Sequence, residues 1–125
     1  MDKKTTAVRY KRNGCNCCQA VIMAYRDELG LSESDVMRTA AAFAAGMGCM
    51  QANCGALIGA GIVLGIKEYG KSPVPPKARK LITRFTEMCG SDTCIELKGV
   101  LTGKVLCSCD DCVANAVEAL EETLK

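Results

Sequence analysis

An uncharged run near the middle of the chain reads Cys54-Gly55-Ala56-Leu57-Ile58-Gly59-Ala60-Gly61-Ile62-Val63-Leu64-Gly65-Ile66. Its bulky apolar residues recur at helical spacing, which predicts a helix from Cys54 to about Tyr69-Gly70. Each glycine would cost about 1 kcal/mol relative to Ala in an exposed helix. We therefore expect this helix to pack closely against a neighbouring helix or a cofactor. Its expected buried side consists of Leu57, Ile58, Ile62 and Ile66.

The apolar composition extends upstream, so that residues 39–66 resemble a membrane span at first sight. A spanning helix needs about 20 continuous apolar residues. Here Gly46-Met47-Gly48 and the polar Gln51-Ala52-Asn53 interrupt the run. The sequence therefore predicts two buried helices joined by a turn, and no membrane span.

Helical spacing continues towards the N-terminus. Apolar residues predict a helix over residues 17–29 that ends at Gly30. Ser32, followed three residues later by Asp35, resembles a capping box and predicts a second helix that stops near Gly46.

The C-terminal half follows the same pattern. Prolines within residues 73–76 break the chain and predict the start of a fourth helix, which runs through Met88. A short turn is expected around Cys94, and a last helix after Asp110-Asp111. No segment alternates like a strand, so we expect an all-α fold, a compact bundle of about five helices with short connections that contain Gly or Pro. Residues 1–125 form one domain in this interpretation, with residues 1–12 as a flexible N-terminal lead.

Charge and aromatic content argue against nucleic acid as a partner. The net charge is +2, Lys and Arg are spread along the chain, and there are two Phe, three Tyr and no Trp. The segment Met1–Arg12 has charges but no apolar core, so it does not read as a secretory signal, and a cytoplasmic location is expected. Thiols in that compartment stay reduced, which favours metal or redox cysteines over structural disulfides.

Cysteine is the unusual component of this chain. There are ten cysteines and no histidine. Without histidine, haem attachment through Cys-x-x-Cys-His and mixed Cys/His zinc sites are excluded, so any metal must be bound mainly by sulfur. The cysteines form four clusters: Cys15/Cys17/Cys18, Cys49/Cys54, Cys89/Cys94 and Cys107/Cys109/Cys112.

Several motifs follow one another in a specific order: Asn16-Cys17-Cys18-Gln19-Ala20-Val21, Gly46-Met47-Gly48, Cys54-Gly55-Ala56-Leu57-Ile58-Gly59, Cys94-Ile95-Glu96-Leu97, and Cys109 ahead of Val113 and Ala116. In this order they resemble the redox-active family named for the cysteine pattern C…CGAxxG…C…C, which also occurs as a domain of split-Soret cytochromes. The resemblance extends from about Asn13 to about Leu120. It implies a helical fold, a redox role, an iron–sulfur site and a homodimer, but no haem.

The resemblance also implies which cysteines are the family's four. Cys109 is preferred over Cys112 because family members place this cysteine four residues before a valine. The four matched positions are Cys17, Cys54, Cys94 and Cys109.

These four cysteines each lie near an expected helix start. There, free N–H groups and the partial positive charge lower a thiol's pKa and donate hydrogen bonds to thiolate sulfur. Four such ends directed at one place would stabilise an iron–sulfur cluster held by four thiolates. Electron transfer or redox sensing is therefore the expected function. Zinc or another soft metal is the alternative, because tetrahedral sulfur ligands suit both.

The remaining cysteines have several open roles. Cys18 and Cys112 lie on or beside apolar stripes, where simple packing explains them as well as chemistry does. The others are candidates for resolving thiols, alternate ligands or a second metal site, and a thiol relay would pair Cys54 with Cys49 or Cys109 with Cys112. The candidate secondary thiols are Cys15, Cys49, Cys89, Cys107 and Cys112.

Motifs for hydrolysis, phosphoryl transfer or dinucleotide binding do not occur in the sequence. We therefore expect a redox carrier or metal-binding module rather than a stand-alone enzyme. Its redox partner would be an oxidoreductase or a second copy of the chain, and the sequence names neither.

Overall fold

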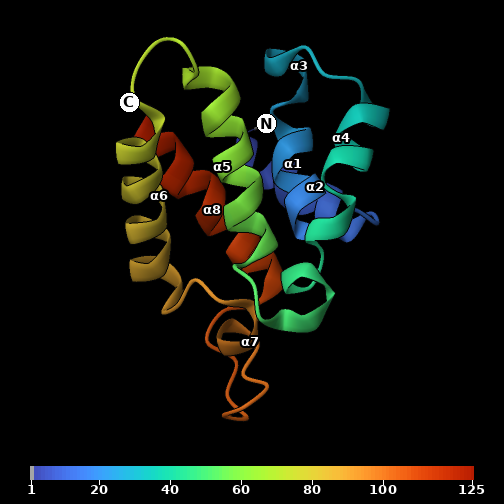
Figure 1. Ribbon diagram of the computed structural model, residues 1–125. Coiled ribbons are helices and arrows are strands. Elements are labelled where there is room, and N and C mark those ends of the chain that lie inside the picture. Colours follow the sequence, from blue (N-terminus) through green and yellow to red (C-terminus); the bar gives the residue numbers. More distant parts are fainter. Residues whose placement is uncertain (1) are drawn as a thin grey trace.

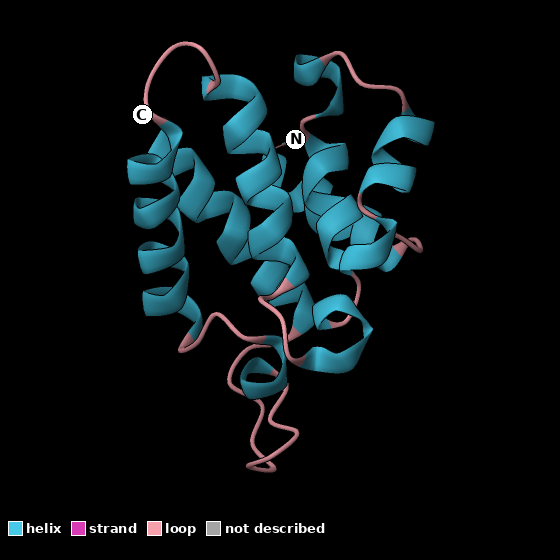
Figure 2. Cartoon of the chain, in the orientation of Figure 1, coloured by secondary structure: helices cyan, strands magenta, loops and turns pink. Residues whose placement is uncertain are grey.

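A computed structural model describes residues 2–125, and within this range the chain forms helices and no β-strand (Figures 1 and 2). The all-α prediction is therefore confirmed. The helices are α1 (Lys3–Arg12), α2 (Cys17–Ala24), α3 (Arg26–Leu29), α4 (Glu33–Thr39), α5 (Gly55–Glu68), α6 (Val74–Cys89), α7 (Cys94–Leu97) and α8 (Cys109–Leu124), with a 3-10 turn at Ala41–Phe43 and a π-helical turn at Gly46–Met50.

The helix count differs from the expected five, because six of the helices in residues 2–125 have seven or more residues. The additional one is α1, which lies in the segment expected to be a flexible lead. The Asp2 side chain caps it by accepting a hydrogen bond from the Thr5 N–H at 2.7 Å. Ala7 is buried, and α1 packs against α2 and α8. Tertiary packing thus holds a helix that local hydrophobicity does not predict.

Helix boundaries elsewhere follow from capping side chains. The predicted cap at Ser32 is present, with its hydroxyl accepting from the Asp35 N–H at 3.0 Å. Asn16 and Gln19 form a complete capping box at the start of α2. The first predicted helix is divided at Tyr25 into α2 and α3, and the second ends at Thr39 instead of continuing to Gly46.

Helices α2, α5 and α8 build the core. Seven of the eight residues of α2 are buried. Helix α5 approaches its neighbours closely at two glycines. A Cβ at Gly59 would lie 2.8 Å from the Cys18 carbonyl oxygen of α2, and one at Gly55 would lie 2.5 Å from the Phe43 carbonyl oxygen of the 3-10 turn. The expected close packing is therefore confirmed at these two positions, whereas Gly61 and Gly65 have no atom within 4 Å of such a Cβ.

This glycine contact also corrects the predicted buried face of α5. Because the two close-packed glycines face α2, the helix is turned so that Ile66 is 45% exposed and Ile58 and Ile62 are only half-buried. Of the predicted set, Leu57 is buried. The buried side chains of α5 are Ala56, Leu57, Ala60, Val63 and Leu64.

The long apolar segment 39–66 is divided by the π-helical turn, and no helix within residues 2–125 is long and apolar enough to span a membrane. Helices α5 and α8 both start, and α6 ends, towards the end of the bundle that carries α7 (Figure 1). We call this the thiol end, because most of the cysteines described below belong to it.

Candidate metal and redox centre

Four helices begin at the four cysteines that the sequence singled out. Cys17, Cys94 and Cys109 are the first residues of α2, α7 and α8, and Cys54 caps α5. The predicted position of each thiol at a helix start is therefore confirmed. Cys54 and Cys94 are buried, whereas Cys17 and Cys109 are half-buried.

Main-chain hydrogen bonds hold two of these helix starts together. The Cys54 N–H donates to the Asp92 carbonyl at 2.8 Å, and the Cys94 N–H donates to the Ala52 carbonyl at 3.1 Å. An isolated antiparallel bridge joins Asn53 to Thr93 between them. The two thiols are thus fixed relative to each other by backbone, although they belong to different parts of the sequence.

Electrostatic interactions connect all four thiols. Burial, together with negative charge on Cys109 and Cys54, raises the pKa of Cys17 to about 12. Burial also raises the pKa of Cys94, and the same two thiolates add to that shift. Charge on Cys54 or Cys109 therefore affects both Cys17 and Cys94.

Cys54 loses its proton more readily than an ordinary thiol. Its thiolate is favoured by the neighbouring Cys112 thiol and by the backbone N–H groups of Ala56 and Leu57. These donors outweigh burial and lower the pKa of Cys54 to about 7. The start of α5 therefore stabilises a thiolate, as expected for a helix N-terminus.

A second, tighter group consists of Cys89, Cys107 and Cys112. Their sulfur atoms all lie within 4.8 Å of one another, and all three side chains are buried. Cys89 is the last residue of α6, Cys107 precedes the cap of α8, and Cys112 lies in the first turn of α8. We call these residues the thiol trio.

Local structure at the start of α8 explains why two members of the trio, Cys107 and Cys112, lie close together. The Ser108 hydroxyl caps α8 by accepting from the Asp111 N–H at 3.1 Å. The residue before a cap and the fourth residue after it commonly meet as a hydrophobic staple, and Cys107 and Cys112 occupy those positions. Packing of α6 against α8 then brings in Cys89.

Two polar side chains contact the trio. The Asn115 side-chain amide lies 3.4 Å from the Cys89 sulfur and 3.8 Å from the Cys107 sulfur. Hydrogen bonds from Cys112, Asn115 and Cys107 lower the pKa of Cys89 to about 6. The Lys98 ammonium lies 3.7 Å from the Cys112 sulfur. Burial lowers the Lys98 pKa, but negative charge on Cys112, Cys109 and Cys54 outweighs it and holds that pKa above its ordinary value.

The sequence interpretation missed both Lys98 and Asn115. Asn115 had a usable signal, because it follows Cys112 by three residues and so shares a face of the predicted helix. Lys98 had none, since its proximity to the sulfur atoms depends on how α7 meets α8. Of the predicted secondary thiols, the structure brings together three, the members of the trio.

The other cysteines have separate surroundings. The Cys15 sulfur lies 3.9 Å from the Met37 sulfur. Cys49 is exposed, and its thiol donates to the Gly46 carbonyl at 3.7 Å. Cys18 is fully buried in the core. All ten cysteines are free thiols.

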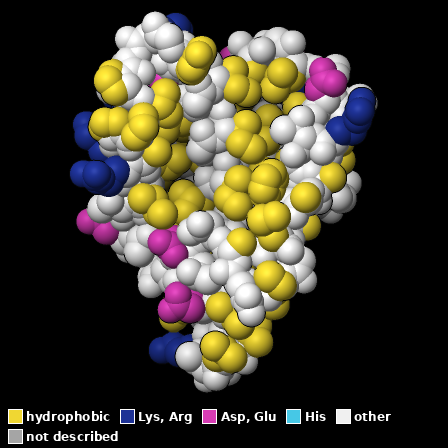
Figure 3. Space-filling view, viewed as in Figure 1, with side chains coloured by type: hydrophobic (Ala, Val, Ile, Leu, Met, Phe, Trp, Pro, Cys, Tyr) yellow, Lys and Arg dark blue, Asp and Glu magenta, His cyan; other side chains and the backbone are white. Residues whose placement is uncertain are grey.

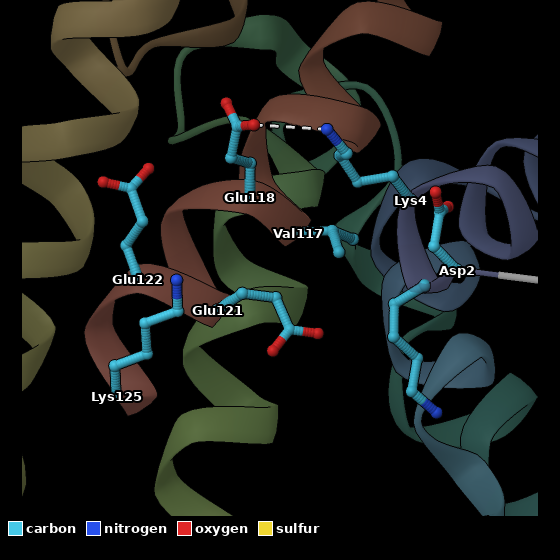
Figure 4. A pocket seen from close by; sticks show the side chains of 8 residues that line it. Asp2, Lys4, Val117, Glu118, Glu121, Glu122 and Lys125 are labelled. Carbon is cyan, nitrogen blue, oxygen red and sulfur yellow. Dashed lines mark hydrogen bonds and ion pairs between the residues drawn. The ribbon is translucent and has the colours of Figure 1, made fainter.

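A hollow of about 500 Å³ lies between α1 and the C-terminal half of α8, away from the helix start at Cys109 (Figure 4). Charged side chains line it, and Lys4 pairs with Glu118 across it at 3.2 Å. It holds no thiol, so the thiol end remains the candidate centre.

Residues 15–123 match the model of a family described as "Putative redox-active protein (C_GCAxxG_C_C)". The chain belongs to this family. The family name writes its central motif as Gly-Cys-Ala, which corrects the order Cys-Gly-Ala expected above, and the chain itself reads Cys54-Gly55-Ala56 at this place. The close approach of Phe43 explains why glycine stands at position 55 here. Comparisons with curated proteins and with solved structures gave no match.

Family membership and the buried trio together indicate redox chemistry or metal binding at the thiol end. Thiolate sulfur is a soft ligand that suits zinc, copper(I) and iron–sulfur clusters.

Proposed function

We propose that this protein carries electrons or senses redox state through an iron–sulfur cluster bound by Cys17, Cys54, Cys94 and Cys109. The observation that carries this proposal is the common placement of the four thiols, each at the start of a helix. Free N–H groups at these positions donate to thiolate sulfur, and such hydrogen bonds are among the factors that set a cluster's potential.

Among residues 2–125, these four cysteines do not form a preformed site for one zinc ion. Around one tetrahedral zinc ion, sulfur atoms bound at about 2.3 Å lie roughly 3.8 Å apart. No three of the four cysteines within this range have their sulfur atoms within 4.8 Å of one another. Binding of a single ion would therefore require the helix starts to move closer together.

Residues around the four thiols would stabilise a bound cluster electrostatically. When bound, the cluster would supply one-electron transfer. The Ala56 and Leu57 N–H groups would hold the Cys54 thiolate, as they do in its absence. The Lys98 ammonium would offset part of the negative charge of four thiolates, because it interacts with Cys54 and Cys109.

A redox partner would approach the thiol end. Cys17 and Cys109 are half-buried, so that edge of the cluster would lie close to the surface. The loop that follows α7 exposes apolar side chains at the narrow tip of the molecule (Figure 3). These side chains are Val100, Leu101, Val105 and Leu106. We place the contact with an oxidoreductase, or with a second copy, at this tip.

A thiol relay is the second candidate, and the contacts of Cys112 favour it. Both Cys54 and Cys89 contribute to the raised pKa of Cys112, so both are close neighbours of its thiol, and oxidation could join it to either. Counting free thiols before and after a mild oxidant tests this function. A constant count excludes it.

The test of the main proposal is iron and sulfide analysis of protein purified without oxygen. We expect both elements, together with visible charge-transfer absorption. Each of Cys17→Ser, Cys54→Ser, Cys94→Ser and Cys109→Ser should reduce the iron content, while Cys49→Ser, at an exposed thiol, should not. Protein that contains neither iron nor sulfide and has no visible absorption would overturn the proposal.

A further inference from the structure

We infer that the thiol trio, Cys89, Cys107 and Cys112, is a second and separate site, which binds one soft divalent cation of the zinc type. This site lies outside the four cysteines assigned to the proposed cluster. It does not depend on that cluster, and it would give the protein one polynuclear and one mononuclear centre at the same end of the bundle.

The distances fit a single ion. All three sulfur atoms lie within 4.8 Å of one another. Sulfur atoms around one zinc ion lie roughly 3.8 Å apart, so binding needs only a small contraction. Cys89 and Cys112 lie on helices that pack against each other. Two of the ligands are therefore already fixed by the fold.

The charge balance favours a divalent cation. Three thiolates and one divalent cation carry a net charge of −1. A buried charge of this kind needs a partner. The Lys98 ammonium lies 3.7 Å from the Cys112 sulfur and neutralises it. Each thiol that binds as thiolate releases its proton to solvent, and no electron is transferred.

Asn115 forms hydrogen bonds to the proposed metal ligands, as residues around metal sites commonly do. Its amide donates to the sulfur atoms of two of the three thiols. Donors of this type orient ligands and adjust their basicity. Apolar packing accounts for Cys107 and Cys112 as a staple, but it does not require a third thiol or an amide directed at the sulfur atoms.

The trio supplies three of the four ligands of a tetrahedral ion. Zinc sites with three protein ligands complete their coordination with water. Cys54 therefore remains available to the proposed cluster.

Cobalt(II) is the probe for this site, because its absorption reports thiolate ligands and tetrahedral geometry. Reduced, metal-free protein should bind cobalt with intense sulfur-to-metal absorption, and zinc should displace it. Cys107→Ser should abolish this tight binding, and Asn115→Ala should weaken it about tenfold. Cys49→Ser is the matched control and should bind like the wild type.

Two further measurements distinguish this site from the proposed cluster and from a folding defect of the variant. Cys17→Ser should lose iron but keep the cobalt signal, which separates this site from the proposed cluster. If Cys107→Ser fails to fold, alkylation of wild-type protein with and without zinc, followed by mass spectrometry, identifies the protected thiols. Protection of Cys89, Cys107 and Cys112 supports the site. Unchanged cobalt binding in folded Cys107→Ser, or zinc protection confined to the other cysteines, would overturn it.

Discussion

The ammonium of Lys98 lies 3.7 Å from the sulfur of Cys112, at the place where the two groups of thiols meet. Its positive charge also interacts with Cys109 and Cys54. Lys98 is thus the cation common to both groups, and its removal should affect all of these thiols.

We expect Lys98→Met to raise the pKa of the neighbouring thiols, because an adjacent positive charge favours the thiolate. A charge this close shifts a pKa by about 1–3 units. The thiolate absorbance of metal-free protein, followed against pH, measures the change. Lys98→Arg should retain most of the effect, and Lys104→Met, in the exposed loop, should cause none. An unchanged titration midpoint in Lys98→Met would contradict the assigned role.

The stability of metal-free protein should depend on pH in two opposite ways. The pKa of Cys89 is lowered to about 6 and that of Cys54 to about 7, from an ordinary value of 9.0. The contribution of these two thiolates to the free energy of unfolding is present above pH 9 and is lost as the pH falls through 7 and 6. The pKa of Cys107 is raised to about 11 and that of Cys17 to about 12, so their contribution is present below pH 9 and is lost as the pH rises towards 12.

The free energy of unfolding should therefore rise from pH 6 towards pH 9 and fall at higher pH. Urea titrations under reducing conditions at several pH values measure this profile. Asn115→Leu should flatten the rising part, because Asn115 helps to lower the Cys89 pKa. A profile that falls steadily from pH 6 would be inconsistent with the thiolate at Cys89.

Gly55→Ala should destabilise the protein by about 1–3 kcal/mol, since the new Cβ would lie 2.5 Å from the Phe43 carbonyl oxygen. Gly61→Ala is the matched control on the same helix, because its Cβ would enter open space. That change should be stabilising by about 0.5–1 kcal/mol. Urea unfolding compares the two. If both variants shift stability in the same direction, the close contact of Gly55 with Phe43 is not as described.

Tyr25→Phe should cost about 1 kcal/mol. The Tyr25 side chain is 1% exposed, and its hydroxyl donates to the Glu121 carboxylate at 2.9 Å. The substitution leaves that carboxylate without this donor. Thermal unfolding measures the loss, and Tyr69→Phe, at an 85% exposed residue, should have no effect. Equal melting temperatures for the two variants would show that the hydrogen bond contributes nothing.

Sequence patterns predicted the structural features that depend on residues close together in the chain. Helical spacing and capping residues such as Ser32 gave the fold class and most helix starts, and with them the positions of Cys17, Cys54, Cys94 and Cys109. Helix α1 was missed because its sequence is largely polar, and contacts with α8, such as Arg12–Asp110 at 2.8 Å, connect residues far apart in the chain.

The sequence could not predict the thiol trio either, because contacts between distant parts of the chain bring its members together. Capping geometry brings Cys107 to Cys112, but Cys89 reaches them only through the packing of α6 on α8. Nothing in the spacing of the cysteines specifies which face of one helix meets another. The sequence therefore predicted the helix starts at which Cys17, Cys54, Cys94 and Cys109 lie, but not how the thiols are grouped.

The bridge between Asn53 and Thr93, with the hydrogen bonds on either side of it, is made of main-chain atoms. The separation of Cys54 and Cys94 is therefore insensitive to the identity of the side chains around them. Mutation can replace neighbouring residues, or introduce further thiols nearby, without moving these two. New chemistry can thus evolve at this end of the protein by single substitutions while the framework beneath it stays the same.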